Sequence, residues 1–176
     1  MIKDMILRSL LPNDAEDYLS FAKEIISEDK FSLTHIEDFK ITLSQEVSWI
    51  ESLNSNDNNI CLIIEHQKRI IANINLLQLK NKKQSHIVDL SINILQTYRN
   101  QGIGKYLIKE ALAALKCKDS IKKIELKVLK NNHRAIHLYS IFGFKIEGEL
   151  EKHVLLENKK YENLLLMGLL KSDIIF

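Results

Sequence analysis

The spacing of hydrophobic residues along this 176-residue chain changes several times between the helical and the strand period. After Pro12, apolar side chains recur at helical spacing through Tyr18, Phe21 and Ile25, and Asp14 can cap the first amides of this helix. Short runs rich in Ile, Val and Leu elsewhere are typical of strands. The pattern predicts strands at residues 2–8, 60–64, 70–79, 87–94, 121–129, 144–156 and 164–170. It predicts further helices at residues 45–53, 105–116 and 131–142.

The order of these elements predicts a mixed sheet with helices on both faces. Strands lie near both ends of the chain, and the last two helices are separated by a single strand. Residues 65–69 have the length of a hairpin loop, and residues 157–160 form a polar turn. One proline and five glycines leave no flexible linker, and the Asn-rich residues 54–59 are few enough for a loop. We therefore expect residues 1–176 to form a single domain of the α/β (α+β) class.

Composition narrows the class of protein further. The chain is 45% hydrophobic and 27% charged, as in ordinary globular domains, and its net charge of +2 gives no reason to expect nucleic acid or a membrane as a partner. No apolar run approaches the roughly 18 residues of a membrane span, and the first residues lack the apolar core of a signal peptide. Cys61 and Cys117 have no second Cys or His at ligand spacing, so we interpret them as buried free thiols. These features predict a cytoplasmic protein without a metal site.

The sequence Arg-Asn-Gln-Gly-Ile-Gly at residues 99–104 lies between a predicted strand and a predicted helix. The first amides of a helix have no intrahelical acceptor and lie at the positive end of the helix dipole, so they can bind phosphate oxygens. A side chain at Gly102 or Gly104 would hold a diphosphate away from these amides, or would forbid the φ values of the turn. The pattern indicates an anion site, although tight connections without a ligand also use such glycine pairs.

A second informative segment, residues 132–144, reads Asn-His-Arg-Ala-Ile-His-Leu-Tyr-Ser-Ile-Phe-Gly-Phe. An Arg-x-x-Gly-x-Gly turn after a strand, followed about thirty residues later by Asn-x-x-Ala-x-x-Leu-Tyr and Gly-Phe, resembles the GNAT acyl-CoA-dependent N-acetyltransferases. The likeness covers residues 5–170, and the fourth predicted strand resembles that of a branch of small bacterial enzymes. The chain departs from the usual pattern at Asn100, where a small residue is common, and at Ser91 and Asn93, which make the fourth strand more polar.

The resemblance implies a mostly antiparallel sheet of about seven strands and acetyl-CoA as acyl donor, with no metal. It implies that backbone groups of Ile92 and Ile94 bind the pantetheine arm and the acetyl carbonyl, that Asn132 hydrogen-bonds the pantetheine, and that Tyr139 lies near the thioester sulfur. It places the diphosphate on the amides of Arg99, Asn100, Gln101, Gly102, Ile103, Gly104 and Lys105. Asn132 also suits the N-cap of the helix that follows, and the two roles are compatible.

The chemistry of acetyl transfer to an amine makes its own demands. A free alkyl amine has a pKa near 10, so about one molecule in a thousand is neutral and nucleophilic at pH 7, and a base or water chain must remove the proton. The departing thiolate has a pKa near 8.5 and is protonated by a neighbouring phenol. Tyr139, between Leu138 and Phe142, suits this task because burial keeps a phenol protonated, although it also suits the role of a core aromatic.

The general base and the acceptor site are less defined by the sequence. Asp89 is the first candidate base, because strand alternation places it with Ser91 and Asn93 opposite the apolar residues, although a solvated Asp89 fits equally well. Glu28 and Glu46 could bind a cationic amine or cap helix starts, and together with Glu24 and Asp29 they favour a polyamine or amino acid acceptor. Three histidines also have suitable pKa values: His86, His133 and His137. The i,i+4 spacing of the last two lacks a third metal ligand.

These observations predict an N-acetyltransferase that moves the acetyl group of acetyl-CoA to a small amine, an amino acid, a polyamine or a protein N-terminus by direct attack in a ternary complex. The alternative is an acyl-CoA-binding or sensing module without turnover, which needs the glycines but not the phenol. A dinucleotide-binding domain is disfavoured, because its Gly-x-Gly-x-x-Gly would follow the first strand. Exposed apolar sheet edges make a homodimer possible.

Overall fold

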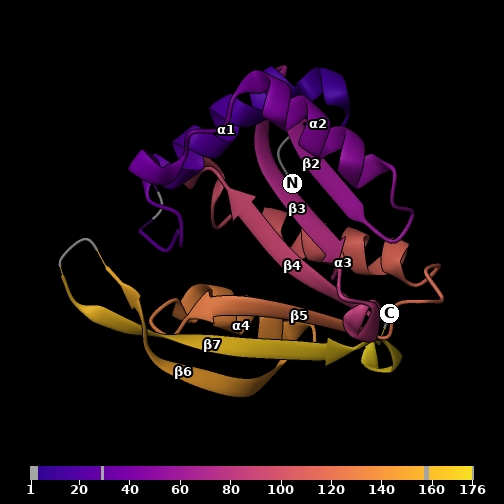
Figure 1. Cartoon of the computed structure of the whole chain (residues 1–176), viewed down its shortest axis with the longest axis vertical. Coiled ribbons are helices and arrows are strands. Elements are labelled where there is room, and N and C mark those ends of the chain that lie inside the picture. Colours follow the sequence, from indigo (N-terminus) through magenta and orange to yellow (C-terminus); the bar gives the residue numbers. More distant parts are fainter. Residues whose placement is uncertain (1–3, 29, 157–158, 176) are drawn as a thin grey trace.

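The computed structural model describes residues 4–28, 30–156 and 159–175. Its seven strands form one sheet in the order β1-β2-β3-β4-β5-β7-β6, in which only the β4–β5 pair is parallel. The strands are β1 Met5–Ser9, β2 Ile60–His66, β3 Arg69–Gln78, β4 Ile87–Ile94, β5 Lys123–Leu129, β6 Lys145–Leu155 and β7 Tyr161–Leu170. The α-helices are α1 Ala15–Glu28, α2 Leu43–Asn54, α3 Ile103–Leu115 and α4 His133–Ile141. The predicted mixed, mostly antiparallel sheet is confirmed (Figure 1).

Helices cover both faces of the sheet. Tyr18 of α1 lies on one face, where its hydroxyl accepts a hydrogen bond from Asn73 of β3 at 2.9 Å. Gly104 of α3 lies on the opposite face, where Ile94 of β4 and Leu138 of α4 approach it closely. In Figure 1, α1 and α2 accordingly lie in front of β2 and β3, with α3 behind them. The prediction of helices on both faces is confirmed.

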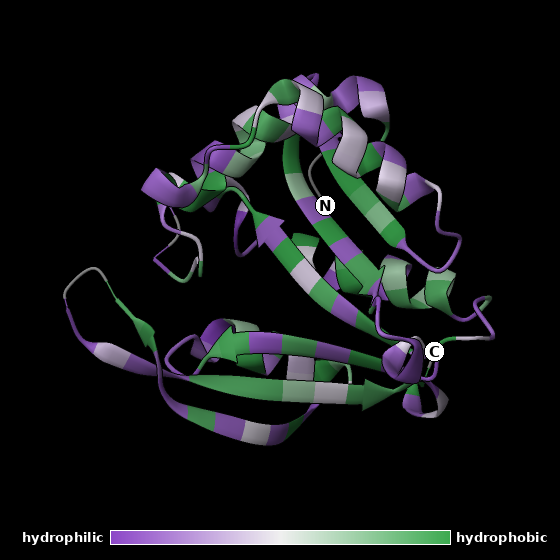
Figure 2. Cartoon of the chain, viewed as in Figure 1, coloured by the Kyte–Doolittle hydropathy of each residue, from purple (hydrophilic) through white to green (hydrophobic). Residues whose placement is uncertain are grey.

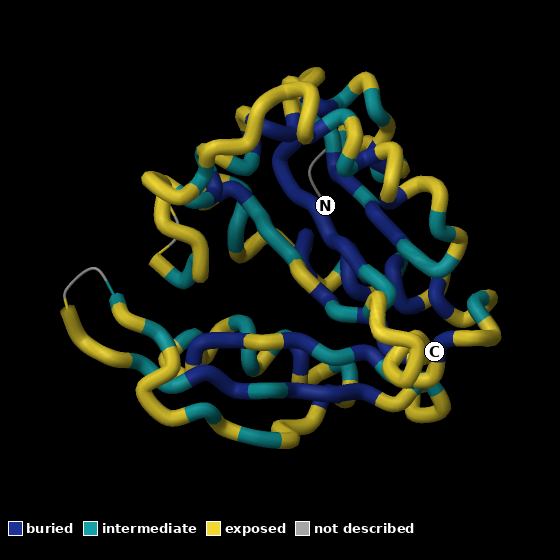
Figure 3. Tube along the Cα trace, viewed as in Figure 1, coloured by how far each residue is buried: buried dark blue, intermediate teal, exposed yellow. Residues whose placement is uncertain are grey.

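The middle of the sheet is buried although part of it is polar. Figure 2 shows hydrophilic positions along β3, and Figure 3 shows almost the whole of that strand as buried. The buried polar residues include Asn73 and Asn75, whose neighbours Ile71, Ile74 and Leu76 belong to the hydrophobic core. Because burying an amide without a partner is unfavourable, these asparagines need partners inside the fold.

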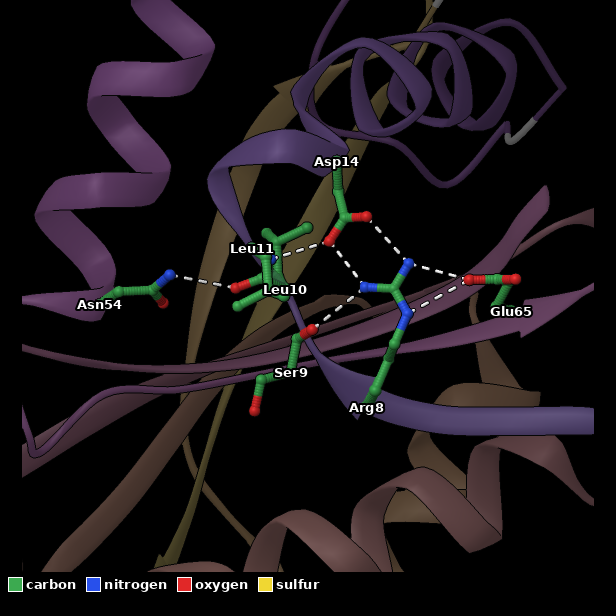
Figure 4. A network of polar contacts seen from close by, with 7 residues as sticks. All are labelled: Arg8, Ser9, Leu10, Leu11, Asp14, Asn54 and Glu65. Atoms are coloured by element: carbon green, nitrogen blue, oxygen red, sulfur yellow. Dashed lines mark hydrogen bonds and ion pairs between the residues drawn. The ribbon is translucent and has the colours of Figure 1, made fainter. Parts of the chain in front are cut away.

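The connection from β1 to α1 is held by an ionic network. Figure 4 shows the Arg8 guanidinium between the carboxylates of Asp14 and Glu65, at 2.7 and 2.9 Å. This arrangement lowers the pKa of Asp14, chiefly through the hydrogen bonds from Arg8. We expected Asp14 to cap the helix amides, but its carboxylate instead accepts a hydrogen bond from the amide of Leu11 at 2.8 Å. The carboxylate therefore fixes the turn before the helix.

Several predicted boundaries shift. Helix α2 begins two residues earlier than expected, because Thr42 and Gln45 form a capping box in which each side chain accepts a hydrogen bond from the other residue's amide. The predicted loop 65–69 shortens to Gln67 and Lys68, which both have positive φ, so the flanking strands extend into it. Cys61 is buried as predicted, whereas Cys117 is exposed just after α3, so the prediction of two buried thiols was wrong for Cys117.

Some predicted features lie partly or wholly outside the described residues: Ile2 and Lys3 of the first strand, Asp29, and the first half of the turn 157–160. In the part of the chain that the structure describes, no helix has the length and apolar character needed to span a bilayer.

Candidate active site

A cleft opens where β4 and β5 separate. The two strands pair only from Ile87 with Lys123 to Asp89 with Glu125, and beyond that point they diverge (Figure 1). The cleft has a volume of about 500 Å³. Its described lining comes from both strands, from the turn before α3, from α4 and from residues 31–34 after α1. Interrupting a ladder in the middle of a sheet leaves backbone hydrogen-bonding groups available to a ligand.

The backbone of β4 presents its free edge to this cleft. The amide of Leu95, just after β4, donates to Ile71 O of β3 at 3.0 Å. Because backbone groups in a strand alternate between its two neighbours, Ile92 and Ile94 direct their N–H and C=O groups away from β3 and into the cleft. The Arg99 side chain uses this edge, since its Nε donates to Ile94 O at 2.8 Å. An amide fixed here can donate a hydrogen bond to an acyl oxygen.

The glycine turn has the backbone geometry of an anion site. Gly102 is the N-cap of α3 with φ of +81°, and Asn100 also has a positive φ of 63°. A Cβ at Gly102 would meet no atom within 4 Å, so the conformation, not crowding, requires glycine there. At Gly104 a Cβ would lie 2.9 Å from Leu138 Cδ2, so glycine there serves the close approach of α4. The amide of Arg99 donates to Gln96 O at 3.2 Å, so this amide is already used within the turn.

The described lining of the cleft is cationic. It includes the side chains of Arg99, Lys105, Lys127 and Arg134, and it includes no carboxylate among the described residues. Arg134 of α4 reaches the glycine turn, where its Nη1 lies 3.4 Å from Asn100 Oδ1. Arg99, Lys105 and Arg134 belong to the turn, the helix start and α4, and cations near free helix amides suit a polyanionic ligand such as a diphosphate.

Helix α4 contributes Asn132 and Tyr139. Asn132 Oδ1 accepts from the amide of Ala135 at 3.2 Å, which confirms the N-cap role, and the residue also lines the cleft, so its Nδ2 remains available to a ligand. Tyr139 lines the cleft while only 7% of its surface is exposed, and its ring packs 5.9 Å from that of Phe144. Burial, and secondarily the negative charge of Asp89, raises the pKa of Tyr139 to about 12. The phenol is therefore protonated at neutral pH.

Asp89 lies at the apex of the divergence, in the last residue pair that joins β4 to β5. It is half-buried and is not among the described residues that line the cleft. Burial raises the pKa of Asp89, while the neighbouring Lys127 lowers it and Glu125 raises it. Ser91 and Asn93, which follow it on the same face of β4, do line the cleft.

A chain of hydrogen bonds fixes Asn93 from inside the fold. Asn93 Nδ2 donates to Asn73 Oδ1 at 3.0 Å, and Asn73 Nδ2 donates to the hydroxyl of Tyr18 at 2.9 Å. Since the amide nitrogen of Asn93 is used in this way, its oxygen remains to accept a hydrogen bond from a group in the cleft. Asn75 donates to the same Tyr18 hydroxyl at 3.4 Å, and its own Oδ1 is buried without a partner among the described residues.

The structure does not bring Glu46 or Glu28 to the cleft lining. Glu46 is 4% exposed on α2, where burial raises its pKa, and it lines neither described cavity. Glu28 accepts a hydrogen bond from the amide of Gln96 at 3.4 Å and is likewise absent from the described lining. Among the three histidines, only His137 lines the cleft. No cluster of three His, Cys, Asp or Glu side chains suited to a metal ion occurs within residues 4–28, 30–156 and 159–175.

A second cavity of about 880 Å³ adjoins the cleft and shares residues 31–34 with it. It lies between the segment after α1 and the hairpin of β6 and β7. Its ionisable side chains in the described part of the chain are Lys30, His35 and Lys159. The sequence gives no signal of this basic lining, because its residues are far apart along the chain.

Sequence reasoning also missed Lys127 and residues 31–34. Lys127 takes the polar position between Leu126 and Val128, and it faces the cleft only because β4 has turned away. The sequence pattern of a strand does not reveal that a lysine at a regular polar position faces a ligand site. Residues 31–34 form a connection without a recognisable pattern, and the fold alone brings them to the cleft.

Comparisons with known proteins agree with this geometry. The acetyltransferase (GNAT) family model matches residues 21–144. A solved structure of a GNAT-family acetyltransferase from Streptococcus pneumoniae superposes with a TM-score of 0.91 and 29% identity, covering 95% of this chain and 99% of that one. The fold is thus that of an acetyltransferase domain. The chain belongs to the GNAT acetyltransferase family.

Among curated relatives, the L-amino acid N-acetyltransferase AaaT of Escherichia coli (strain K12) is 26% identical over 102 residues, which span 58% of this chain and 62% of that protein. The spermine/spermidine N(1)-acetyltransferase of Bacillus subtilis (strain 168) is 38% identical over 56 residues, which span 32% of this chain and 37% of that protein. The chain therefore matches less than two thirds of the length of either relative.

Proposed function

We propose that this protein is an N-acetyltransferase that moves the acetyl group of acetyl-CoA to a primary amine by direct attack in a ternary complex. The observation that supports this most is the end of the β4–β5 ladder at Asp89 and Glu125, directly followed by a cationic cleft with a glycine turn at a helix start. The relatives named for amino acids and for spermine support an amine as acceptor.

The cleft suits acetyl-CoA at both ends. At one end, the amides from Asn100 to Lys105, with the cations of Arg99, Lys105 and Arg134, bind the diphosphate. At the other end, the free edge of β4 at Ile92 and Ile94 binds the pantetheine arm and polarises the acetyl carbonyl. Asn132 donates to the pantetheine through the amide nitrogen that its capping role leaves unused.

The reaction needs a proton acceptor on one side of the thioester and a proton donor on the other. The amine nitrogen forms a bond to the carbonyl carbon, the carbon–sulfur bond breaks, and the sulfur leaves with the electron pair. Tyr139 donates a proton to this sulfur, because its buried phenol is protonated at neutral pH. Asp89 accepts the proton of the amine, through water where contact is not direct, and burial brings its pKa closer to neutrality.

The test combines binding and turnover in one sample. Acetyl-CoA is titrated into the protein in a calorimeter, and release of free thiol is then followed after adding amino acids, polyamines or short peptides. Binding followed by thiol release with one class identifies a transferase and its acceptor class. Binding without release from any class would favour a sensing module, and absence of binding would reject the assignment of the glycine turn.

A further inference from the structure

Lys127 occupies an unusual place for a lysine, in the middle of β5 within a seven-stranded sheet. It is the first residue on its face of β5 after Glu125, where the pairing with β4 ends. Because Asp89 and Glu125 are partners, alternation places Lys127 on the same face as Ser91 and Asn93 of the opposite wall. It lines the cleft and is exposed there. The glycine turn belongs to the other face, beneath α3, so Lys127 is not one of the cations that surround the turn.

The nearest lysines on either side of Lys127 along the chain have carboxylate partners. Lys123 Nζ lies 2.6 Å from Glu147 Oε2, and Lys130, just past the end of β5, lies 2.7 Å from Glu149 Oε1. Lys127 has no ion-pair partner within 4.0 Å among the described residues, because its neighbour on β7 is Leu166 and the next residue across the sheet is Gly148. On the side of β7 and β6, no acid lies opposite Lys127, and the residue lines the cleft.

Charges of both signs lie near the apex of the cleft. Asp89 lies on β4 and Lys127 on β5, and the two influence each other enough for Lys127 to lower the pKa of Asp89. Glu125, the other charged group here, adjoins Asp89 at the closed end. An acceptor that carries an amine and a carboxylate on the same carbon matches this pair, since its amine lies toward Asp89 and its carboxylate toward Lys127.

We propose that Lys127 binds the carboxylate of the acceptor and that the acceptor is a free α-amino acid, an inference that rests on the proposed acetyltransferase function. The two lysines of the adjoining cavity, Lys30 and Lys159, favour the same acceptor class, because a polyamine would bring further positive charges toward them. Lys127 also assists the reaction, since a neighbouring cation disfavours the protonated form of the attacking amine. Of the two acceptor classes that the acidic residues favoured in the sequence, polyamine and amino acid, this proposal keeps the amino acid.

The experiment measures thiol release with matched acceptors. The twenty amino acids are screened first, and the best one is compared with its amide and with its decarboxylated amine. The wild-type protein is expected to prefer the amino acid over both. The Lys127→Met variant keeps the apolar stem and removes the charge, so KM for the amino acid should rise about ten- to hundredfold, as for loss of a charged hydrogen bond. KM for the amide should not change.

Two controls separate this role from a structural one. The Lys127→Arg variant should restore most of the affinity for the amino acid, and Lys123→Met, which removes a lysine paired with Glu147 outside the cleft, should leave KM unchanged. The dissociation constant of acetyl-CoA should be the same in all three variants. Preference of the wild-type protein for a carboxylate-free amine, or an equal loss toward amino acid and amide in Lys127→Met, would overturn the inference while leaving the acetyltransferase intact. Absence of thiol release with every amine would reject both.

Discussion

A substitution at Gly102 provides the sharpest test of the anion site, because backbone conformation alone requires glycine at this position. Its φ of +81° is unfavourable for residues with a side chain, and a Cβ there would meet no atom within 4 Å. The Gly102→Ala variant therefore adds backbone strain of about 1–2 kcal/mol without a clash. For a chain of this size that strain lowers Tm by roughly 2–8 °C. If the free turn relaxes to avoid it, binding must restore the conformation, and the dissociation constant of acetyl-CoA rises roughly 5- to 30-fold.

The assay pairs thermal unfolding with calorimetric titration of acetyl-CoA. Gly102→Asn is the informative second variant, because asparagine tolerates positive φ and Asn100 already does so in the same turn. It should bind acetyl-CoA more tightly than Gly102→Ala. Gly148→Ala is the control, since a Cβ there would make an ordinary 3.6 Å contact with Leu166, and its affinity for acetyl-CoA should equal that of the wild type.

Two results would refute this reasoning. If Gly102→Ala keeps both the wild-type Tm and the wild-type affinity for acetyl-CoA, the conformation of Gly102 governs neither stability nor binding. If Gly102→Asn binds less tightly than Gly102→Ala, the side chain acts by obstructing the ligand and not through φ.

Three further predictions concern single groups. Tyr139→Phe should lower kcat on the order of 100-fold or more with acetyl-CoA affinity retained, because the proton donor is lost and the packing is kept; unchanged turnover would dismiss the acid role. In the wild type, kcat/KM should rise with pH as Asp89, whose pKa is raised, loses its proton. Asp89→Asn should remove this rise, and a variant that keeps it would exclude Asp89 as the base. Arg8→Met should lower stability at pH 7 by about 1–3 kcal/mol. Because Arg8 lowers the pKa of Asp14, its contribution is complete above the unfolded pKa near 3.9 and is lost as pH falls through the folded pKa. The difference in Tm between wild type and variant should therefore shrink below about pH 4, and a constant difference down to pH 3 would contradict the assignment.

Local sequence predicted most of the elements, because the spacing of apolar residues reflects which face of each helix or strand is buried. The errors in the predicted element boundaries also have local physical causes. The helix at 45–53 was predicted too short because the capping pair Thr42 and Gln45 precedes its apolar stripe. The loop 65–69 was predicted too long because Gln67 and Lys68 adopt positive φ without glycine, which no hydrophobic pattern reveals.

The candidate site also contains residues that the sequence could predict and residues whose position depends on packing. The glycine turn, Asn132 and Tyr139 lie in contiguous motifs, so their proximity in the cleft could be predicted from resemblance, and the structure places the turn and both residues along one cleft. Glu46 shows the opposite case. Its position near a helix start suggested a substrate contact, but the packing of α2 on the sheet buries it away from the cleft lining.

The sequence by itself determined the order of the elements, the family resemblance and the glycine-rich helix start, because each can be read from short motifs and their spacing along the chain. The tertiary structure alone decided where β4 and β5 part, and hence which side chains face the cleft. Lys127 and Asn93 are far apart in the chain, and their roles depend on strand register and on what packs behind them. Since a one-residue change of register would reverse every face, that information exists only once the sheet has formed.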